Sequence, residues 1–236
     1  MKNIKLFEEA SQYEASKDGF EYPTVSYVKE TDMVHYLMKT ELYEWVDLGL
    51  PSGLKWAAWN VGATKPEEFG LYFAWGETQG YTGITDTKQF KWSDYTLCDG
   101  TNSNMTKYNA TDGLTTLEPA DDAAYATDSS CRMPTSGECQ ELIDNTTSEW
   151  VDDYNGTGVP GRIFTSNVNG NSIFVPAAGF CNYGSVDGVG QDGLLWSSSL
   201  GSSNVQSAYY LSFVSDYVGV IDSGRYSGLP VRAVKE

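Results

Sequence analysis

The chain has 236 residues, of which 40% are hydrophobic and 14% aromatic, enough for a packed core and too many for a disordered chain. Its formal net charge of −17 and sequence pI of about 4.3 argue against nucleic-acid partners and anionic membranes, which select basic proteins. No stretch approaches the roughly 20 apolar residues of a membrane-spanning helix, so we expect no membrane insertion.

The first 42 residues are predicted to form a segment, 1–42, separate from a domain of residues 43–236. The segment lacks the apolar stretch of a secretory signal, so synthesis and folding in a cytoplasm are expected. LFEEASQYEASKD has a short helical pattern, whereas YPTVSYVKETDMVHYLM predicts two strands joined by the turn KETD. The apolar residues expected to face each other are Val25, Tyr27, Val34 and Tyr36. Because a lone hairpin is marginally stable, it must pack on the domain or on copies of itself.

The domain is predicted to open with two strands. Val46 and Leu48 alternate with polar neighbours, LPSG forms a turn, and LKWAAWNVG continues as a second strand. The second strand carries Trp56 and Trp59, and clustered tryptophans pack in cores more often than they form platforms for sugars. The polar stretch QFKWSDYTLCDGTNSNMTKYNATDG is predicted to be a long surface loop.

The middle of the domain holds one clear helix signal, in CRMPTSGECQELIDNTTSEW. Thr135 followed by Glu138 matches a capping box. The apolar stripe that follows at helical spacing consists of Cys139, Leu142 and Ile143. After Trp150 the segments GRIFTSN, NSIFVPAAGF, LLWSSS, SAYYLSFVS, YVGVID and LPVRAV are predicted strands, separated by Asn-Gly, Asp-Gly and Ser-Gly turns. The predicted fold class is α+β, with an antiparallel, β-rich C-terminal half and few helices.

The sequence offers little support for catalysis. It has no G-x-S-x-G nucleophile motif, no phosphate-binding loop and no dinucleotide fingerprint, and its single histidine, His35, lies in the N-terminal hairpin. Its many acidic residues single out no carboxylate pair for glycoside hydrolysis. We therefore expect neither enzyme activity nor a cofactor.

Metal binding has little support either. The four cysteines show no CxxC spacing and are expected to be reduced, mostly buried thiols; they are Cys98, Cys131, Cys139 and Cys181. The cluster EPADDAAY, with Glu118, Asp121 and Asp122, lacks the alternating ligand spacing of an EF-hand loop. An acid-rich helix N-terminus is the favoured interpretation of this cluster.

The C-terminal third lacks three common residue types. Glu is absent from residues 150–235, Lys from 108–234 and Met from 134–236. Tyr, Ser, Gly and Asn are abundant there, as in antibody loops, where Tyr supplies large contact area and the small residues supply hydrogen bonds. Composition alone does not decide between such a binding surface and tyrosines that pack across strands; the residues concerned are Tyr183, Tyr210, Tyr217 and Tyr226.

Several separate motifs of the domain resemble one family. They are EWVDLGLPSGLKWAAWNVGATKPEEFGLYFAWGET, CRMPTSGECQELID, NGNSIFVPAAGF, and WSSSLGSSNVQSAYYLSF followed by an Arg and LPVRAV. Together they resemble, over about residues 43–236, the major-paralogous-domain branch of the C-type-lectin-like superfamily, found in gut bacteria of the Bacteroidales type and their phages. The resemblance implies a C-type-lectin-like fold, distantly similar to that of formylglycine-generating enzymes.

This branch includes the variable proteins of diversity-generating retroelements. In that system an error-prone reverse transcriptase mutates template adenines, so Asn codons become codons for many residues but never for Lys, Glu, Met, Gln or Trp. The resemblance would therefore explain the residue types missing from the C-terminal third. Gln191, Trp196 and Gln206 lie outside the reachable set and are assigned to the fixed frame.

The resemblance also implies that the C-terminal strands hold a rigid backbone while exposed side chains on one face bind a ligand. The residues placed on this face are Asn182, Tyr183, Asp187, Asp192, Leu194, Tyr210, Asp216, Tyr217, Ile221, Ser223 and Tyr226. The tyrosines would be anchors, and the acids would accept hydrogen bonds from sugar hydroxyls or from Lys and Arg. Trp196 and Ser197–Ser199 would support the frame from below. Formylglycine-generating enzymes use a cysteine pair in this region, and here Cys181 has no partner.

The function implied is receptor binding at a phage tail tip, through a variable face for a glycan or protein on the host surface. The N-terminal segment resembles leader segments of phage structural proteins and would join other tail proteins, in a homo-oligomer with a trimer favoured. The expected location is the virion, after synthesis in the host cytoplasm. The alternatives are a bacterial surface or fimbrial-tip adhesin and an enzyme of the formylglycine-generating-like fold. An enzyme predicts a deep acidic or thiol-bearing cleft, and a binding protein predicts a shallow, Tyr-rich surface.

Overall fold

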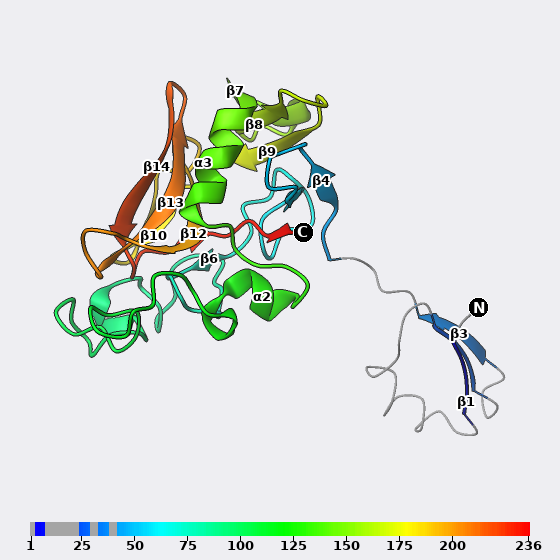
Figure 1. Cartoon of the computed structure of the whole chain (residues 1–236), viewed down its shortest axis with the longest axis horizontal. Helices are drawn as coiled ribbons and strands as arrows, with labels where there is room; N and C mark the ends of the chain where they lie inside the picture. Colours follow the sequence, from blue (N-terminus) through cyan, green and yellow to red (C-terminus); the bar gives the residue numbers. More distant parts are fainter. Residues whose placement is uncertain (1–2, 8–23, 29–32, 38–41) are drawn as a thin grey trace. The chain divides into compact units, whose positions relative to one another are not determined.

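The computed structural model of the protein describes residues 3–7, 24–28, 33–37 and 42–236 (Figure 1). The chain divides into two compact units, Met1–Leu42 and Tyr43–Glu236. No helix in the described part of the chain combines the length and the apolar character needed to cross a membrane.

The N-terminal unit contains a three-stranded sheet in the order β1-β2-β3. Its strands are β1 (Asn3–Phe7), β2 (Thr24–Val28) and β3 (Met33–Leu37). β2 and β3 pair antiparallel in the predicted register, with Val25 opposite Tyr36. β1, which pairs parallel with β2, was not predicted and takes up Leu6 and Phe7, the first residues of the expected helix. The rest of that helix and the KETD turn lie outside the described residues.

Short antiparallel pairs join the beginning and the end of the large unit. Their strands are β4 (Trp45–Asp47), β5 (Lys55–Ala57), β6 (Tyr72–Phe73), β15 (Leu229–Pro230) and β16 (Val234–Lys235). β16 pairs with β5, which pairs with β4, and β15 pairs with β6. The first strands of the domain are thus held against its last residues.

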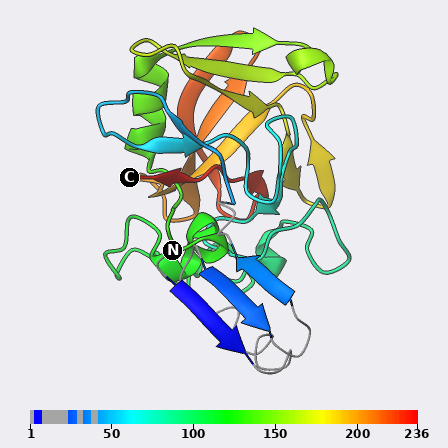
Figure 2. The same cartoon turned by 90° about the vertical axis from the view of Figure 1, so that its right-hand side faces the viewer.

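One helix and two three-stranded antiparallel sheets form the centre of the large unit (Figure 2). Their bounds are α3 (Ser136–Asn145), β7 (Thr146–Val151), β8 (Gly161–Ser166), β9 (Ser172–Pro176), β12 (Gly193–Leu200), β13 (Ser207–Val214) and β14 (Tyr217–Gly224). α3 begins with the predicted capping box, in which Thr135 and Glu138 exchange side-chain-to-backbone hydrogen bonds. β7 follows α3 directly and was not predicted, because its sequence TTSEWV lacks a clear apolar alternation.

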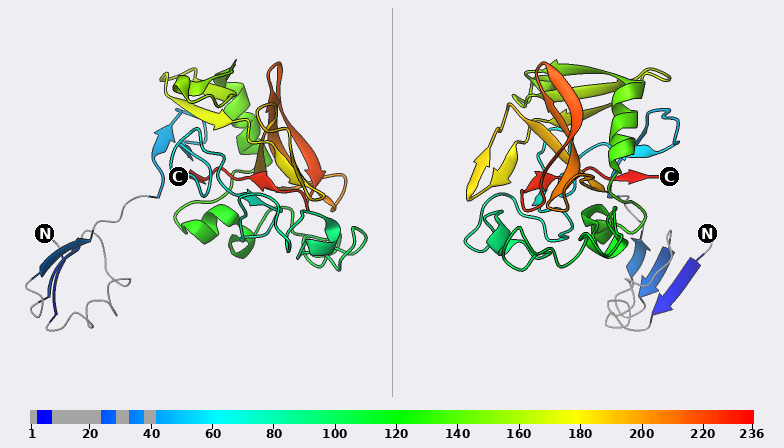
Figure 3. Two further views of the ribbon diagram at one scale, coloured as in Figure 1. Left: turned by 180° about the vertical axis from the view of Figure 1, so that it is seen from behind. Right: turned by 60° about the vertical axis from the view of Figure 1, so that its left-hand side comes forward.

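The remaining elements are short. They are η2 (Trp92–Asp94), η3 (Pro119–Asp121), α2 (Ala123–Thr127), η4 (Tyr154–Gly156), β10 (Phe180–Asn182) and β11 (Ser185–Asp187). The antiparallel β10–β11 hairpin lies beside the β12–β13–β14 sheet (Figure 3). Among the described residues, α2 and α3 are the only α-helices and most strands pair antiparallel, so the fold is α+β and β-rich, as predicted.

One face of the β12–β13–β14 sheet packs against α3. Successive residues of a strand point to opposite sides, so Leu195, Leu211 and Phe213 share this face. They are buried in one cluster with Cys139 and Leu142 of the predicted apolar stripe. Burying side chains of this size contributes roughly 1.5–3 kcal/mol each, which fixes the sheet on the helix.

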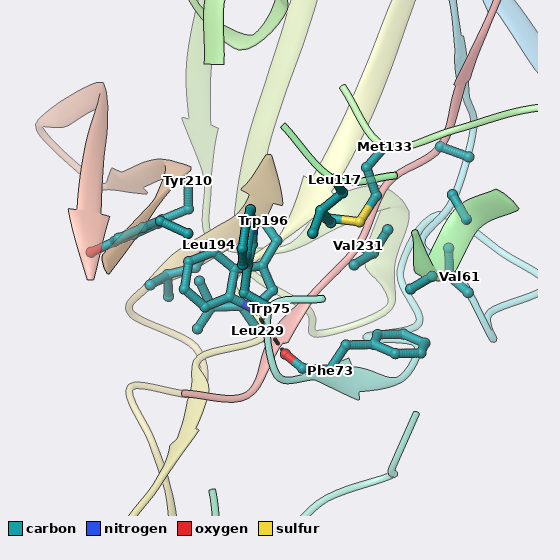
Figure 4. Close-up of a cluster of buried hydrophobic side chains, with 14 of the residues drawn as sticks. Val61, Phe73, Trp75, Leu117, Met133, Leu194, Trp196, Tyr210, Leu229 and Val231 are labelled. Carbon is teal, nitrogen blue, oxygen red and sulfur yellow. Dashed lines mark hydrogen bonds between the residues drawn. The ribbon is translucent and has the colours of Figure 1, made fainter. Parts of the chain in front are cut away.

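The opposite face of the same sheet covers a second cluster (Figure 4). Trp196 of β12 lies fully buried there, and its indole N–H donates to the Phe73 carbonyl at 2.8 Å. Trp75 packs in the same cluster, and Tyr210 of β13 lies edge-on to Trp196, with ring centroids 5.7 Å apart. In Figure 4 the hydroxyl end of Tyr210 points away from this cluster. The side of the sheet that carries Tyr210 is therefore buried at β12 and leads outward toward β14.

Residues 89–113, predicted to be a surface loop, belong partly to the core. Phe90, Tyr95 and Tyr108 are buried. Arg225, which is 0% exposed, donates to the Tyr95 hydroxyl at 2.8 Å and to the carbonyls of Lys107 and Tyr108 at 3.0 and 3.1 Å. The prediction was wrong because this polar stretch carries separate aromatic side chains that pack around a buried guanidinium from the far end of the chain.

Candidate functional site

Five of the predicted ligand-face residues line one cavity of about 110 Å³, which we call the aromatic pocket; they are Asn182, Leu194, Tyr210, Ser223 and Tyr226. β10, β12, β13 and β14 each supply one of them, and Tyr226 follows β14. Phe180, Ser227 and Leu229 complete the lining. Residues separated by more than 40 positions in the sequence thus meet because the β10–β11 hairpin adjoins the C-terminal sheet.

Strand register determines which side chains surround the pocket. Tyr210 lies opposite Ile221 of β14, and one row away Leu194 lies opposite Ser212 of β13. Residues two apart on a strand share a face, so Ile221 and Ser223 point to the same side as Tyr210. β14 is the last strand of the sheet, and Ile221 on it is 38% exposed.

Tyr217 extends this surface along β14. A side chain at Gly219 would collide with the Tyr217 hydroxyl, which shows that the Tyr217 ring lies along the strand over Gly219. Tyr217 is 48% exposed. The absence of a side chain at Gly219 therefore makes room for a flat aromatic surface between the turn and Ile221.

An aromatic row borders the other side of the pocket. The ring of Tyr226 contacts Tyr183 at a centroid distance of 5.2 Å and Trp92 at 4.7 Å. Tyr183 is 63% exposed and occupies the two-residue turn of the β10–β11 hairpin. Its backbone N–H donates to the Phe90 carbonyl at 3.2 Å, which ties the turn to the loop that carries Trp92. The row therefore presents one exposed ring supported by two half-buried ones.

The polar groups of the pocket are mainly acceptors. The Asn182 Oδ1 atom is buried without a hydrogen-bond partner, which is costly unless a ligand supplies a donor. Burial raises the pKa of Tyr210 to about 12, and the negative charges of Asp222 and Asp192 add to the effect. Burial also raises the pKa of Tyr226, with a further contribution from its hydrogen bond with Tyr183.

The three acids predicted on the ligand face lie around the pocket and do not line it. Asp187 of β11 pairs with Phe180 across the hairpin and accepts a hydrogen bond from Ser185 Oγ at 2.5 Å. Asp192 directly precedes β12, and Asp216 is exposed in the turn between β13 and β14. The predicted set is thus a central cluster with acids at its periphery.

Two of the predicted side chains do not project from the surface. Leu194 is 9% exposed and Tyr210 is 8% exposed, and both pack in the cluster around Trp196. The expectation that they stand on an exposed face is wrong because β12 and β13 are covered on this side, whereas β14 is open. They can reach a ligand only as walls of the pocket.

Sequence reasoning missed several neighbours of the site. Trp92 lies in the stretch taken for a surface loop, and Phe180 and Ser212 carry no short-range signal of a binding role. Val186 and Val189 are exposed on the same hairpin and the turn after it. Exposure of such apolar residues depends on tertiary packing and leaves no periodic signal in the sequence.

The structure gives the enzyme alternative no reactive thiol. All four cysteines are free and buried, as predicted. Burial, followed by the charge of Asp187, raises the pKa of Cys181 to about 12, so this thiol stays protonated near neutral pH. Burial likewise raises the pKa of Cys98 and of Cys139.

Acidic side chains are grouped at a polar cavity of about 460 Å³, but hydrogen bonds hold them there. Glu77 accepts from Lys88 Nζ at 2.6 Å and from the Thr96 amide at 2.8 Å, and Asp94 accepts from backbone amides. Asp122 caps α2, as the interpretation of EPADDAAY proposed. In the described part of the chain, no group of three or more His, Cys, Asp or Glu side chains could hold a metal ion.

Comparisons of the chain with protein-family models, with curated proteins and with solved structures found no match. The functional assignment must therefore come from the geometry of the aromatic pocket and the surface around it.

Proposed function

We propose that residues 43–236 form the receptor-binding domain of a phage tail-tip protein, which attaches to a host-surface ligand through the aromatic pocket and the exposed side chains beside it. One observation carries the proposal. Of eight clearly exposed large hydrophobic residues in the described part, five lie on the β10–β11 hairpin, the turn after it and the edge strand β14. The five are Tyr183, Val186, Val189, Tyr217 and Ile221, and the other three are Leu42, Tyr125 and Val168.

Such a concentration is unusual on a protein that binds nothing. Soluble proteins expose single apolar residues commonly, but contiguous apolar patches mark interaction sites. Tyrosine at these positions gives large contact area with little loss of side-chain entropy on binding. A small pocket beside exposed rings also provides the kind of desolvated site in which a few residues dominate binding energy.

The same arrangement supports a C-type-lectin-like variable protein. Trp196, Ser197 and Ser198, proposed as the fixed frame, are buried, while Tyr183 and Tyr217 are exposed above them. Trp75 donates to the Ser197 carbonyl at 2.8 Å, which anchors the frame to the core. The backbone would therefore stay constant while exposed side chains change. The N-terminal unit would attach the domain to other tail proteins, and oligomerisation as a trimer would raise avidity.

The test is binding of the purified protein to intact cells from a panel of gut anaerobes. The variant Tyr183→Ser/Ile221→Ser removes two exposed apolar side chains of the site, and Tyr125→Ser/Val168→Ser removes two exposed apolar side chains elsewhere. We expect selective binding that the first variant loses by at least tenfold and the second retains. Equal binding by all three proteins would contradict the proposal, provided that circular dichroism shows each to be folded.

A further inference from the structure

The charges around the aromatic pocket have one sign. Residues 163–224, which supply β9 to β14, contain no Lys, Arg, His or Glu and four aspartates, namely Asp187, Asp192, Asp216 and Asp222. Arg225 follows them, but it is fully buried and donates to a hydroxyl and three carbonyls. The supporting loop adds one half-buried cation, Lys91, next to Trp92. This surface therefore attracts a cationic ligand and repels an anionic one.

The size of the pocket limits what it can enclose. At about 110 Å³ it is well below the roughly 300–1,000 Å³ of sites that enclose a whole small molecule. It can hold a side group while the rest of a ligand lies on Tyr183, Tyr217 and Ile221 outside. Phe180 and Leu194 form apolar walls suited to a chain of methylene groups.

The polar atoms require a donor. Asn182 Oδ1 has no partner, and the Tyr210 hydroxyl lies in the field of Asp192 and Asp222. The faces of Tyr210 and Tyr226 carry the negative side of an aromatic quadrupole, which attracts cations. Acceptors, carboxylates and ring faces together favour an ammonium group over a neutral or acidic one.

We propose that the aromatic pocket binds a lysine side chain of a protein ligand, with the methylene stem against Phe180 and Leu194 and the ammonium group between the tyrosines and the aspartates. This inference rests on the proposed function, and it selects a protein as the receptor class. A compact ammonium on a flexible stem fits a narrow pocket better than the broader, planar guanidinium of arginine.

A titration of the ¹⁵N-labelled protein tests the chemistry directly. The probe is Nα-acetyl-L-lysine methylamide, with the norleucine, arginine and glutamate analogues and D-glucosamine as comparisons. We expect saturable shifts of the amide resonances of Asn182, Ser223 and Tyr226 with the lysine probe, and at least tenfold weaker binding of every other compound. Equal binding of the norleucine analogue, tighter binding of the arginine analogue or of glucosamine, or no saturable shift would overturn the proposal.

Charge-removing variants provide the matched control. Asp192→Asn/Asp222→Asn should weaken binding of the lysine probe at least fivefold, whereas Asp99→Asn/Asp144→Asn, at exposed sites outside the pocket, should leave it unchanged. An equal effect of both pairs would mean general attraction to an acidic protein and would overturn a specific site.

Cell binding separates this inference from the proposed function. If Tyr183→Ser/Ile221→Ser abolishes cell binding while Asp192→Asn/Asp222→Asn does not reduce it, the receptor-binding function stands and the lysine inference is wrong. If cell binding survives both pairs of substitutions, the proposed function itself is wrong.

Discussion

Tyr183 has a backbone conformation that its side chain disfavours. It has a φ of 44° in the two-residue turn between β10 and β11, and the following Gly184 has a φ of 84°. Turns with both central residues at positive φ favour Asn-Gly, and a bulky residue at the first position costs roughly 1–2 kcal/mol. Because strain of this kind collects at ligand sites, the exposed ring of Tyr183 is better explained by binding than by folding.

Replacing Tyr183 with Asn should therefore separate stability from binding. We expect Tyr183→Asn to raise the free energy of unfolding by about 1 kcal/mol, since Asn tolerates the left-handed conformation. The same change should lower binding to cells. Urea denaturation measures the first effect, and a loss of stability in this variant would show that the ring packs as part of the fold.

Arg225 connects the strand that carries Ser223 to the loop that carries Trp92. Its guanidinium donates to the Tyr95 hydroxyl and to the carbonyl of Val205, and it stacks over Trp75 with its carbon 4.8 Å from the ring centroid. The contacts are hydrogen bonds and cation–π interactions, with no carboxylate partner among the printed bonds of this side chain.

Removing this guanidinium should destabilise the domain strongly. Arg225→Met keeps the apolar stem but leaves buried carbonyls without donors, at about 1–3 kcal/mol each, so we expect a loss of at least about 3 kcal/mol in unfolding free energy. Arg225→Lys should lie between Met and wild type. A loss below about 1 kcal/mol for Arg225→Met would contradict the role given to this residue.

At the scale of elements, β14 combines two functions. Val218 and Val220 pack toward α3 on one face, and Tyr217 and Ile221 are exposed on the other. The alternation in the sequence predicted the strand, and the turn signals predicted its ends. Sequence alone did not show that β14 is an edge strand while β13 is central, and this difference decides which side chains reach solvent.

Gly219 offers a test of the surface on β14. Gly219→Val should keep or raise stability by up to about 1 kcal/mol, because valine favours strands and glycine weakens them. It should also displace the Tyr217 ring, which lies where the new side chain would be, and so reduce cell binding. Wild-type binding by a stable Gly219→Val protein would show that Tyr217 makes no contact with the ligand.

The start of α3 predicts a pH effect on stability. Burial opposes ionisation of Glu138, but the Arg132 guanidinium, with bonds of 2.6 and 2.8 Å, and the Thr135 amide outweigh it and lower the pKa of Glu138. A lowered pKa in the folded state gives stabilisation that is present above the ordinary value of 4.5 and is lost as pH falls through the lowered value.

Glu138→Gln should therefore be less stable than wild type at neutral pH, by about 1 kcal/mol. The difference should shrink as the pH falls below the ordinary carboxyl value, because wild-type Glu138 is then protonated. Denaturation of both proteins at several pH values gives the comparison. A difference that stays constant down to about pH 2 would contradict this assignment.

For the whole molecule, local patterns predicted more of the fold than of the site. The capping box and strand alternation depend on neighbouring residues, so α3 and the strands after residue 160 could be predicted. The burial of Phe90 and Tyr108 depends on Arg225, more than 100 positions away, and no local pattern reports it. The five pocket residues were proposed through family resemblance, and their meeting in one cavity required the tertiary structure.

The acidity of the molecule is also unevenly used. The net charge is −17, yet Arg225, Arg232 and Lys88 are buried and bonded inside the large unit. These cations stabilise the interior, and the acids are left to face solvent or a ligand. Binding by a cationic partner should therefore weaken as salt is added, because exposed charges are screened within about 10 Å at 0.1 M ionic strength.

The most direct test of the central claim is a serine scan of every exposed residue from 43 to 236, read by capture on cells that bind the wild-type protein and normalised to protease-resistant protein. Losses above about tenfold, or about 1.4 kcal/mol, should cluster at the pocket and its rim, with the strongest at Tyr183, Tyr217, Ile221 and Tyr226. Losses that centre on Tyr125 or Val168, or that spread evenly over the surface, would contradict a receptor site on the C-terminal sheet.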